Sequence, residues 1–464
     1  MGPVRFAGMA EETPDCPGCA RRDREIAELK AEMARLRAMV EELQRSVKRQ
    51  TAPFSKGEPK ADPKTPGRKP GADYGDHACR ETPSHIDEVH RARLPDLSAC
   101  CGAAVRRTGE VVQYQAEIVR RTVQRRFDIE VGCCTECGKR VQGRHPLQTS
   151  DALGAAANQL GAEAKALAVH LNKDLGLSYG KVRRFFLMAF GLSVSRGGAC
   201  KAVLKAADRA RPCYREIERT LRRSRRTYPD ETGWKVAGRL QWLWVFVART
   251  AVLYRIRPSR GGDVVVEVLG QDWSGEMGHD GWAPYDAFER ATHQQCLAHL
   301  LRRCDHLLEV ATRGAVRFPR AVKATLQQAF RLRNRRDEGE VSAHGVAVAT
   351  GRLQVRLDRL LVWTKTNAVN ERFAKHLFRH RDQIFTFLKR PGLEATNWPA
   401  EQAIRPAVVN RKVWGGNRTE RGARAQEILV STLQTCAIRG HDSFDFLVDL
   451  LQRPAYHQPL LIPV

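Results

Sequence analysis

The stretch Asp230-Glu231-Thr232-Gly233-Trp234 decides the fold that we expect for this chain. It leads into a run rich in Trp, Val and Phe, Arg239 to Thr250, whose composition favours a β-strand. An acid at the end of a short strand, just before such a hairpin, is held rigidly and can still face a metal ion or a substrate. We therefore predict a mixed α/β domain in which Asp230 is a site residue.

Two later acids stand in comparable settings. Asp280 lies within Gly278-His279-Asp280-Gly281-Trp282, before a predicted helix, and Glu401 lies in the first turn of a helix that contains Pro399. Cleaving and joining phosphodiesters requires an activated oxygen nucleophile and a stabilised leaving oxygen, which two Mg²⁺ ions about 3.5–4 Å apart provide. Mg²⁺ prefers oxygen ligands. We predict that Asp230, Asp280 and Glu401 together bind Mg²⁺ or Mn²⁺, with two ions in each site.

The composition indicates a nucleic-acid partner. The 464 residues include 78 Lys and Arg against 52 Asp and Glu, which gives a formal net charge of +26. A surplus of that size favours nucleic acid over small acidic molecules. We find no long apolar run and no signal-peptide pattern, so we expect a soluble chain that is neither exported nor bound to a membrane. Its 13 Cys residues are then expected to be reduced or bound to metal.

Composition and periodicity divide the chain into segments, and the overall prediction is a multidomain α/β protein. Apolar residues recur every three or four positions from Ile26 to Val47, which predicts a coiled coil and a homo-oligomer. One amphipathic helix packed on its own domain is the alternative. The expected order is a disordered N-terminus with a Cys-x-x-Cys pair (1–20), the coiled coil (21–50), a basic Pro-rich linker (51–78), a zinc-ribbon-like module (79–147), a helical DNA-binding region (148–225), the first part of the catalytic domain (226–304), a helical insertion (305–395), and the second part of the catalytic domain with a C-terminal helix (396–464).

Cysteines within residues 79–147 predict a zinc ribbon. Cys134-Thr135-Glu136-Cys137-Gly138 has the spacing of a zinc knuckle, with a Gly for the turn. An opposing knuckle is expected at Cys100-Cys101-Gly102, across a strand-like stretch from Val111 to Val131, although Ser98 stands where a further Cys is expected. Buried thiols, or a knuckle that no longer binds metal, are the alternatives. The predicted zinc ligands are Cys101, Cys134 and Cys137, with a fourth from Cys100, Cys133 or His90.

The sequence also predicts elements that contact DNA. Ser178 begins a predicted helix, Gly191 to Ser195 form a turn, and Arg196 begins a second, basic helix. This is the helix-turn-helix arrangement, although small helical bundles imitate it. A Gly-rich basic loop near Glu401 fits a close approach to DNA. The cations expected to contact DNA are Lys181, Arg183, Arg184, Arg196, Lys201, Arg405, Arg411, Lys412 and Arg418.

Four blocks of this sequence resemble the signature blocks of the insertion-sequence-66 family of transposases. In order they are Asp230-Glu231-Thr232, Asp280-Gly281-Trp282-Ala283-Pro284-Tyr285, Cys296-Leu297-Ala298-His299-Leu300-Leu301-Arg302, and Glu401-Gln402-Ala403-Ile404-Arg405-Pro406 with Arg411-Lys412. The resemblance implies a ribonuclease-H-like catalytic domain with an all-helical insertion. It also implies a DDE triad of Asp230, Asp280 and Glu401, and metal-dependent strand cleavage and transfer at terminal inverted repeats. Target DNA and helper proteins are further implied partners, in the bacterial cytoplasm at the nucleoid.

Several alternatives stay open at this point. Asp286 is a rival for the second acid, but Asp280 matches the Asp-Gly-aromatic block of the family. Cys296 and His299 are interpreted as core residues that shape the rear wall of the site, and a role as metal ligands is the less favoured alternative. Two other functions remain as hypotheses: a DNA-binding protein with the same fold that performs no strand transfer, and a metal-dependent nuclease that hydrolyses DNA without joining it.

Overall fold

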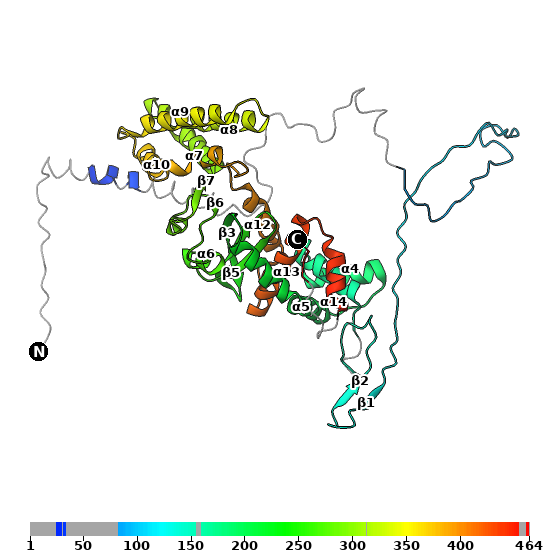
Figure 1. Ribbon diagram of the computed structural model, residues 1–464. Coiled ribbons are helices and arrows are strands. Elements are labelled where there is room, and N and C mark those ends of the chain that lie inside the picture. Colours follow the sequence, from blue (N-terminus) through cyan, green and yellow to red (C-terminus); the bar gives the residue numbers. More distant parts are fainter. Residues whose placement is uncertain are drawn as a thin grey trace, which may run out of the picture. The chain divides into compact units, whose positions relative to one another are not determined.

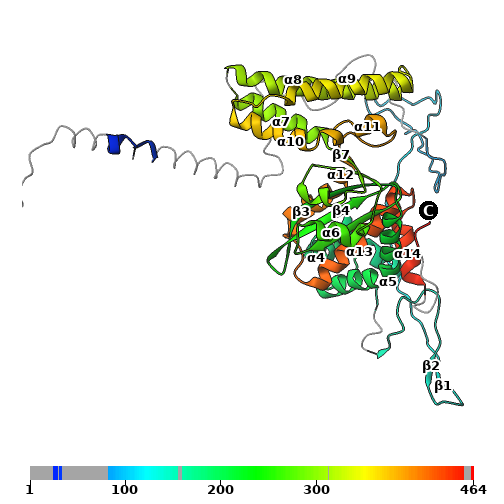
Figure 2. The same cartoon turned by 60° about the vertical axis from the view of Figure 1, so that its left-hand side comes forward.

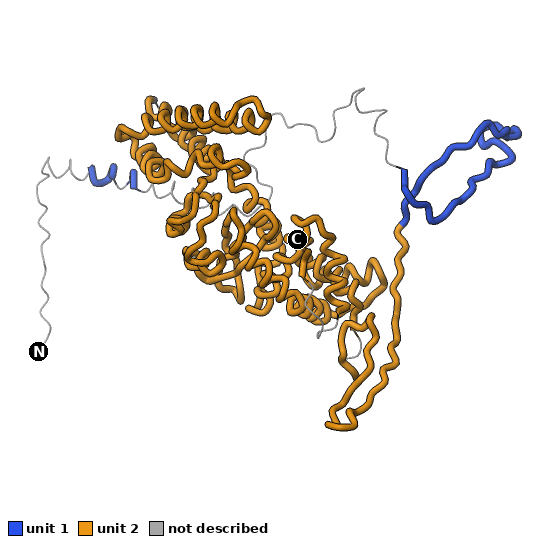
Figure 3. Tube along the Cα trace, viewed as in Figure 1, with its two compact units in different colours: residues 1–117 blue, residues 118–464 orange. Residues whose placement is uncertain are grey.

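The structure, a computed structural model, describes residues 25–29, 31–33, 82–154, 159–311, 313–453 and 461–463. The chain divides into two compact units, residues 1–117 and 118–464 (Figure 3). Residues 25–29 and 31–33 are helical, and the remainder of the predicted coiled coil lies outside the described residues. So do the predicted Cys-x-x-Cys pair near the N-terminus and the Pro-rich linker. In the described part of the chain, no helix has the length and apolar character needed to cross a membrane.

A five-stranded mixed sheet lies at the centre of the second unit (Figure 1). The strands follow the order β5-β4-β3-β6-β7, in which β3 pairs antiparallel with β4 and β4 antiparallel with β5. On the other side β3 pairs in parallel with β6, and β6 in parallel with β7. This confirms the predicted mixed α/β architecture. The strand bounds are β3 (Arg226–Val236), β4 (Arg239–Val247), β5 (Val252–Arg257), β6 (Glu276–His279) and β7 (Thr292–Gln295).

The β3–β4 hairpin is closed by a two-residue turn. Ala237 and Gly238 both have positive φ angles, 49° and 79°. A two-residue turn with both φ angles positive matches the right-handed twist of the flanking strands, and this explains the tight pairing of Val236 with Arg239. The hairpin aligns Asp230 of β3 opposite Val245 of β4.

Helices cover both faces of the sheet because successive residues of a strand point to opposite sides. Trp244 and Phe246 of β4 pack in one core, with residues of α5 (Arg196–Arg222) and α13 (Glu420–Ile438). Leu243 and Val245 pack in the other core, with residues of α12 and of the helices from α7 to α11 inclusive. In Figures 1 and 2, α8 and α9 lie side by side, and α5 lies across the sheet from them. Other helices are α3 (Ala162–Val169), α4 (Tyr179–Phe190), α6 (Gly262–Leu269), α7 (Leu297–Val310), α8 (Arg317–Asp337), α9 (Ala343–Leu361), α10 (Ala368–Arg379), α11 (Thr386–Lys389), α12 (Trp398–Trp414) and α14 (Ser443–Gln452).

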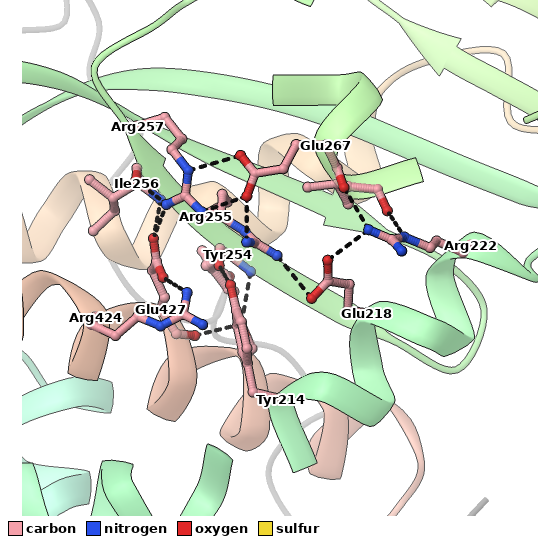
Figure 4. Close-up of polar contacts among 12 residues, drawn as sticks. Tyr214, Glu218, Arg222, Tyr254, Arg255, Ile256, Arg257, Glu267, Arg424 and Glu427 are labelled. Atoms are coloured by element: carbon pink, nitrogen blue, oxygen red, sulfur yellow. Dashed lines mark hydrogen bonds and ion pairs between the residues drawn. The ribbon is translucent and has the colours of Figure 1, made fainter. Parts of the chain in front are cut away.

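Helix α13 supplies hydrogen-bond acceptors to β5, the strand at one edge of the sheet. Side chains spaced four apart on this helix accept the backbone N–H groups of alternate residues on β5. Figure 4 shows one of these bonds, from Ile256 to Glu427. Four helical residues rise about 6 Å and two strand residues about 6.6 Å, so the two spacings match. The helix therefore replaces a sixth strand and protects an edge that would otherwise expose unpaired groups. The bonds join Val252 to Thr435 (3.1 Å), Tyr254 to Ser431 (2.8 Å) and Ile256 to Glu427 (2.7 Å).

Three sequence predictions of local structure are wrong. Asp230 was expected at the end of a short strand, but it lies inside β3, which runs from Arg226 to Val236. A single C-terminal helix was expected after the second part of the catalytic domain, but the structure has two helices there, α13 and α14. The break occurs because Gly440 takes a φ of 72° and the Asp442 side chain caps α14 by accepting the N–H groups of Phe444 and Asp445. The stretch from Val111 to Val131 has no assigned strand before Val131. A strand needs a partner, and side chains here such as Val119 (86% exposed) have no core to join.

Candidate active site

Asp230 lies on β3, on the face of the sheet that packs against α12. It shares this face with Tyr228 and Trp234, which belong to the same core as Ala400 of α12. Its Oδ1 accepts the N–H of Glu231 at 2.9 Å. Burial raises the pKa of Asp230 to about 7, with smaller contributions from the charges of its carboxylate neighbours, Glu231, Asp280 and Glu401. Two acids that are distant in sequence therefore act electrostatically on Asp230.

Asp280 lies just after β6, the strand that pairs with β3. Its Oδ1 accepts the N–H of Trp282 at 3.0 Å, which closes a turn over Gly281. Gly281 has a φ of +87°, and a Cβ there would lie 2.7 Å from Nε2 of Gln295. Only glycine fits this backbone conformation and this close approach without strain. The Asp-Gly-Trp sequence is thus explained by the turn that places Asp280.

One buried histidine, His279, and one half-buried histidine, His293, fix the start of this turn. Nδ1 of His279 accepts the N–H of Gly281 at 3.0 Å, so the ring proton of His279 is on Nε2. That nitrogen lies 3.0 Å from Nδ1 of His293, whose Nε2 in turn donates to the Phe288 carbonyl oxygen at 2.9 Å. Burial lowers the pKa of His279 well below its ordinary value, and the neighbouring His293 lowers it further. His279 is therefore neutral and serves to hold the backbone at Asp280.

Glu401 lies in the first turn of α12, and the start of that helix is tied to two other elements. The Asn397 side chain donates to the Pro229 carbonyl oxygen at 2.9 Å, directly before Asp230. The Asn397 N–H donates to Sγ of Cys296 at 3.1 Å, at the start of α7. Arg302 of α7 donates to Oε1 of Glu401 at 3.1 Å. These bonds place Glu401 beside Asp230 at the point where α7, α12 and β3 meet.

Glu231 is a fourth acid that sequence reasoning missed as a site residue. Its side chain is only 3% exposed and accepts bonds from Arg260 at 2.9 Å and from the Tyr285 hydroxyl at 3.1 Å. The Arg260 guanidinium lies between two aromatic rings, 4.6 Å from that of Trp242 and 3.7 Å from that of Trp282. Burial raises the pKa of Glu231. Strand alternation was the available signal, because it points residue 231 to the face opposite Asp230. Glu231 joins β3 to the Asp280 loop.

A comparison with protein families decides the identity of this domain. The model of the family described as "Transposase IS66 family" matches residues 158–425, which is more than half of the chain. The chain belongs to the IS66 family of transposases. The matched residues include all three acids of the site and every strand of the central sheet.

A curated relative adds no activity to this assignment. A protein of Sinorhizobium fredii, named uncharacterized protein y4qI, is 23% identical over 242 residues. The aligned region covers 47% of this chain and 44% of that protein, so the chain spans less than half the length of the relative. The IS66 family match therefore carries the assignment.

The cations predicted to contact DNA in this IS66 transposase have two kinds of environment. Lys181, Arg183 and Arg184 of α4 are exposed, as are the other predicted cations except Arg411. Arg411 is half-buried and donates to the Thr232 hydroxyl at 3.1 Å and to the Gly233 carbonyl oxygen. Burial lowers the pKa of Arg411. Arg411 thus fastens α12 to β3, whereas the exposed cations are accessible from solvent.

Asp286, the rival for the second acid, lies in a short 3-10 helix, Ala283–Ala287. It forms an ion pair with Arg379 of α10 at 2.8 Å. The charge of Asp280, in contrast, contributes to the raised pKa of Asp230. The geometry therefore favours Asp280 over Asp286 as the partner of Asp230.

The predicted zinc ligands lie in both compact units, so the ribbon stays a prediction. Cys100 and Cys101 belong to the first unit, and Cys134 and Cys137 to the second. Cys134 follows β1 (Val131–Cys133), which pairs with β2 (Arg140–Gln142). Hydrogen bonds from the backbone of Cys137 and then of Glu136 lower the pKa of Cys134, and the Ser98 side chain does so for Cys100. Both changes favour the thiolate form that binds zinc.

The raised pKa of Asp230 predicts a pH-dependent stability. Its ordinary value of 3.8 becomes about 7 in the folded chain. Between these two values the folded state retains a proton that the unfolded state has released, so stability falls as pH rises from about 4 to 7. With a chelator present, Asp230→Asn is expected to raise the melting temperature at pH 8 and to flatten its dependence on pH. Thermal unfolding from pH 5 to 8 measures this. The control is Asp272→Asn at an exposed site, and an unchanged slope in Asp230→Asn contradicts the assignment.

Proposed function

We propose that this IS66 transposase is a DDE enzyme that cleaves DNA at the ends of an insertion sequence and joins the 3′ ends to target DNA. The observation that carries the proposal is that three acids from separate segments lie on neighbouring elements: β3 pairs with β6, after which Asp280 follows, and Asn397 at the start of α12 bonds to Pro229, directly before Asp230. Such clustering raises the free energy of the folded chain, and a bound divalent cation offsets the repulsion. A cluster of carboxylates beside exposed basic residues suits a phosphodiester substrate.

The order of the strands supports a ribonuclease-H-like fold, as the family resemblance implies. Three antiparallel strands are followed by two parallel ones, and the acids lie on β3, directly after β6 and in α12. The helices from α7 to α11 lie between the second and third acids in sequence. Because β3 and β6 are neighbours, the first two acids are placed by the sheet itself. The third is placed by the bonds of Asn397 to Pro229 and Cys296.

The donor atoms of the site fit a hard divalent cation. Asp230, Asp280 and Glu401 offer carboxylate oxygens, the ligands that Mg²⁺ and Mn²⁺ prefer. Such ions, when bound, activate the attacking oxygen and stabilise the leaving oxygen. The chain itself holds each carboxylate in place: the hairpin fixes Asp230, the Gly281 turn fixes Asp280, and the start of α12 fixes Glu401.

Recognition of DNA belongs to the same proposal. The exposed cations of α4 and α5, together with Arg405, Lys412 and Arg418, are expected to bind the backbones of terminal inverted repeats and target DNA. Each phosphate contact makes binding weaker at higher salt concentration.

We further propose oligomerisation through residues 21–50 and structural zinc in residues 79–147, with helper proteins as additional partners. The alternatives are a DNA-binding protein without strand transfer and a nuclease, and the presence of all three acids favours the enzyme over the binder.

The test offers pre-cleaved insertion-sequence ends and plasmid target DNA to the purified chain with Mg²⁺ or Mn²⁺. Asp230→Ala is assayed alongside the wild type. Joined product from the wild type alone supports the transposase. Hydrolysed DNA without joined product establishes the nuclease instead, and retarded DNA with neither product establishes the binding protein.

A further inference from the structure

We propose that Nδ1 of His299 is a ligand of the divalent cation bound by Glu401, and that this cation displaces Arg302 from both side chains. The inference rests on the proposed function, because it concerns the same metal site. It assigns a nitrogen ligand to a site that the acids alone would make an all-oxygen one. It also assigns Arg302 the role of occupying Glu401 until the cation binds.

The first observation is the convergence of ligand atoms from two helix starts. Cys296, His299 and Glu401 each present a ligand atom, and these atoms all lie within 4.8 Å of one another. Nδ1 of His299 lies 3.6 Å from Oε1 of Glu401. Asp280 is close as well, because its charge, like that of Glu401, acts on the pKa of His299. His299 thus faces the two acids that are expected to bind the metal.

The second observation is an unsatisfied ring nitrogen. Nδ1 of His299 is enclosed, and no hydrogen-bond partner reaches it from the described residues. A buried polar atom left in this way costs about 1–3 kcal/mol, so such atoms usually have a partner. A nitrogen of Arg302 lies 3.2 Å from the other ring nitrogen, Nε2, which must therefore accept rather than carry a proton. The ring is neutral and can use a lone pair, and a cation shared with Glu401 supplies the missing partner.

Arg302 holds the positions that the cation needs. Its Nη2 donates to Oε1 of Glu401 at 3.1 Å and lies 3.2 Å from Nε2 of His299. An arginine only donates, so Nε2 is the acceptor and the ring proton is on Nδ1. Ligation through Nδ1 requires that proton to move to Nε2, which can then no longer accept from Arg302. The cation also takes the Glu401 oxygen. Both contacts of Arg302 are lost, and its side chain, 62% exposed, is released toward solvent and DNA phosphate.

Cys296 is not expected to be a third ligand of the cation, because its sulfur is already engaged in other contacts. Its Sγ accepts the N–H of Asn397 at 3.1 Å, and backbone groups of His299 and Ala298 also bond to it. Burial raises the pKa of Cys296, so the sulfur stays a thiol. It joins the starts of α7 and α12, as expected of a core residue. His299, which the sequence had also placed in the core, instead faces the acids.

A nitrogen ligand changes which cation the site favours. Mg²⁺ seldom accepts imidazole, whereas Mn²⁺ and other first-row transition metals bind it readily. The site is therefore expected to bind Mn²⁺ more tightly than Mg²⁺ by about tenfold or more. Asp230→Asn is expected to weaken Mn²⁺ binding while leaving the nitrogen ligand in place.

The test is pulsed electron paramagnetic resonance of the purified chain with Mn²⁺ alone. The wild type is expected to show ¹⁴N modulation from one imidazole, and His299→Ala is expected to lose it and to bind Mn²⁺ about tenfold more weakly. His306→Ala, an exposed histidine on the same helix, is the matched control and should keep both properties. Arg302→Gln removes the competitor and is expected to tighten Mn²⁺ binding several-fold.

The outcomes separate this inference from the proposed function. Mn²⁺ bound without ¹⁴N modulation, or modulation that survives in His299→Ala, overturns the inference, as does a wild-type chain that binds no Mn²⁺. None of these results alters the joining assay with Asp230→Ala, which alone decides the proposed function. Weaker Mn²⁺ binding in Arg302→Gln overturns the displacement of Arg302, because a competing cation cannot assist binding.

Discussion

Replacing Asp230 by Asn is expected to lower the rate of DNA strand joining by about 10³-fold or more. The amide keeps the shape of the carboxylate but removes the charge that binds a divalent cation, whose catalytic contribution is several kcal/mol. The same change removes a carboxylate whose pKa is raised to about 7, so the folded chain is expected to become more stable at pH 8. A loss of activity combined with a gain in stability is what we expect of a catalytic acid. The joining assay and thermal unfolding on the same preparations measure both effects.

Glu231→Gln is the matched comparison for Asp230→Asn, because the two acids are adjacent on β3 and point to opposite faces. Glu231 pairs with Arg260 and accepts from Tyr285, on the face of β3 opposite Asp230. Removing its charge is expected to destabilise the chain and to reduce joining far less than Asp230→Asn does. If Glu231→Gln abolished joining in a fully folded chain while Asp230→Asn did not, the assignment of the first catalytic acid would be wrong.

Replacing Glu427 by Ala is expected to destabilise the second unit by about 3–5 kcal/mol, the usual cost of breaking a buried ion pair. Glu427 is 2% exposed and accepts the Ile256 N–H at 2.7 Å, together with bonds from Arg257 and Arg424 (Figure 4). The substitution leaves a buried strand N–H without an acceptor and two arginines without their shared carboxylate. Chemical denaturation, followed by tryptophan fluorescence, measures the change.

Two further variants on α13 separate the contributions within the Glu427 result. Ser431→Ala removes one acceptor from β5 without removing a charge, so a smaller loss of about 1–3 kcal/mol is expected. Glu420→Ala, at the exposed start of the same helix, is expected to change stability by no more than about 0.5 kcal/mol. Equal losses in all three variants would show that α13 does not protect the edge of the sheet as described.

Sequence reasoning reached the elements whose signals are local. The apolar run beginning at Arg239 predicted β4 because strand propensity depends on side chains that fit a pleated surface. The first turn of α12 was evident from Pro399, which suits a position where the N–H has no helical partner. The mixed α/β architecture followed from such patterns, and the ordered blocks around Asp230, Asp280 and Glu401 indicated the family.

Contacts between distant segments escaped the same reasoning. Arg411 looked like one of several basic residues near a Gly-rich loop, yet it donates to Thr232 and Gly233 of β3. Glu427 looked like any helical acid, yet it completes the hydrogen bonding of β5. The partners of Arg411 on β3 and of Glu427 on β5 are at least 170 residues away in the sequence. No rule based on spacing along a helix therefore identifies these contacts.

By itself, the sequence determined which residues supply carboxylates, where the central strands run and which family the chain belongs to. These follow from residue type, from local spacing and from the order of motifs. Only the tertiary structure decided that Glu231 pairs with Arg260, that Arg302 holds Glu401, and that Nδ1 of His299 is enclosed beside that acid. The reason is physical: ion pairing, burial and pKa shifts depend on distances across the fold, and segments far apart in the chain set those distances.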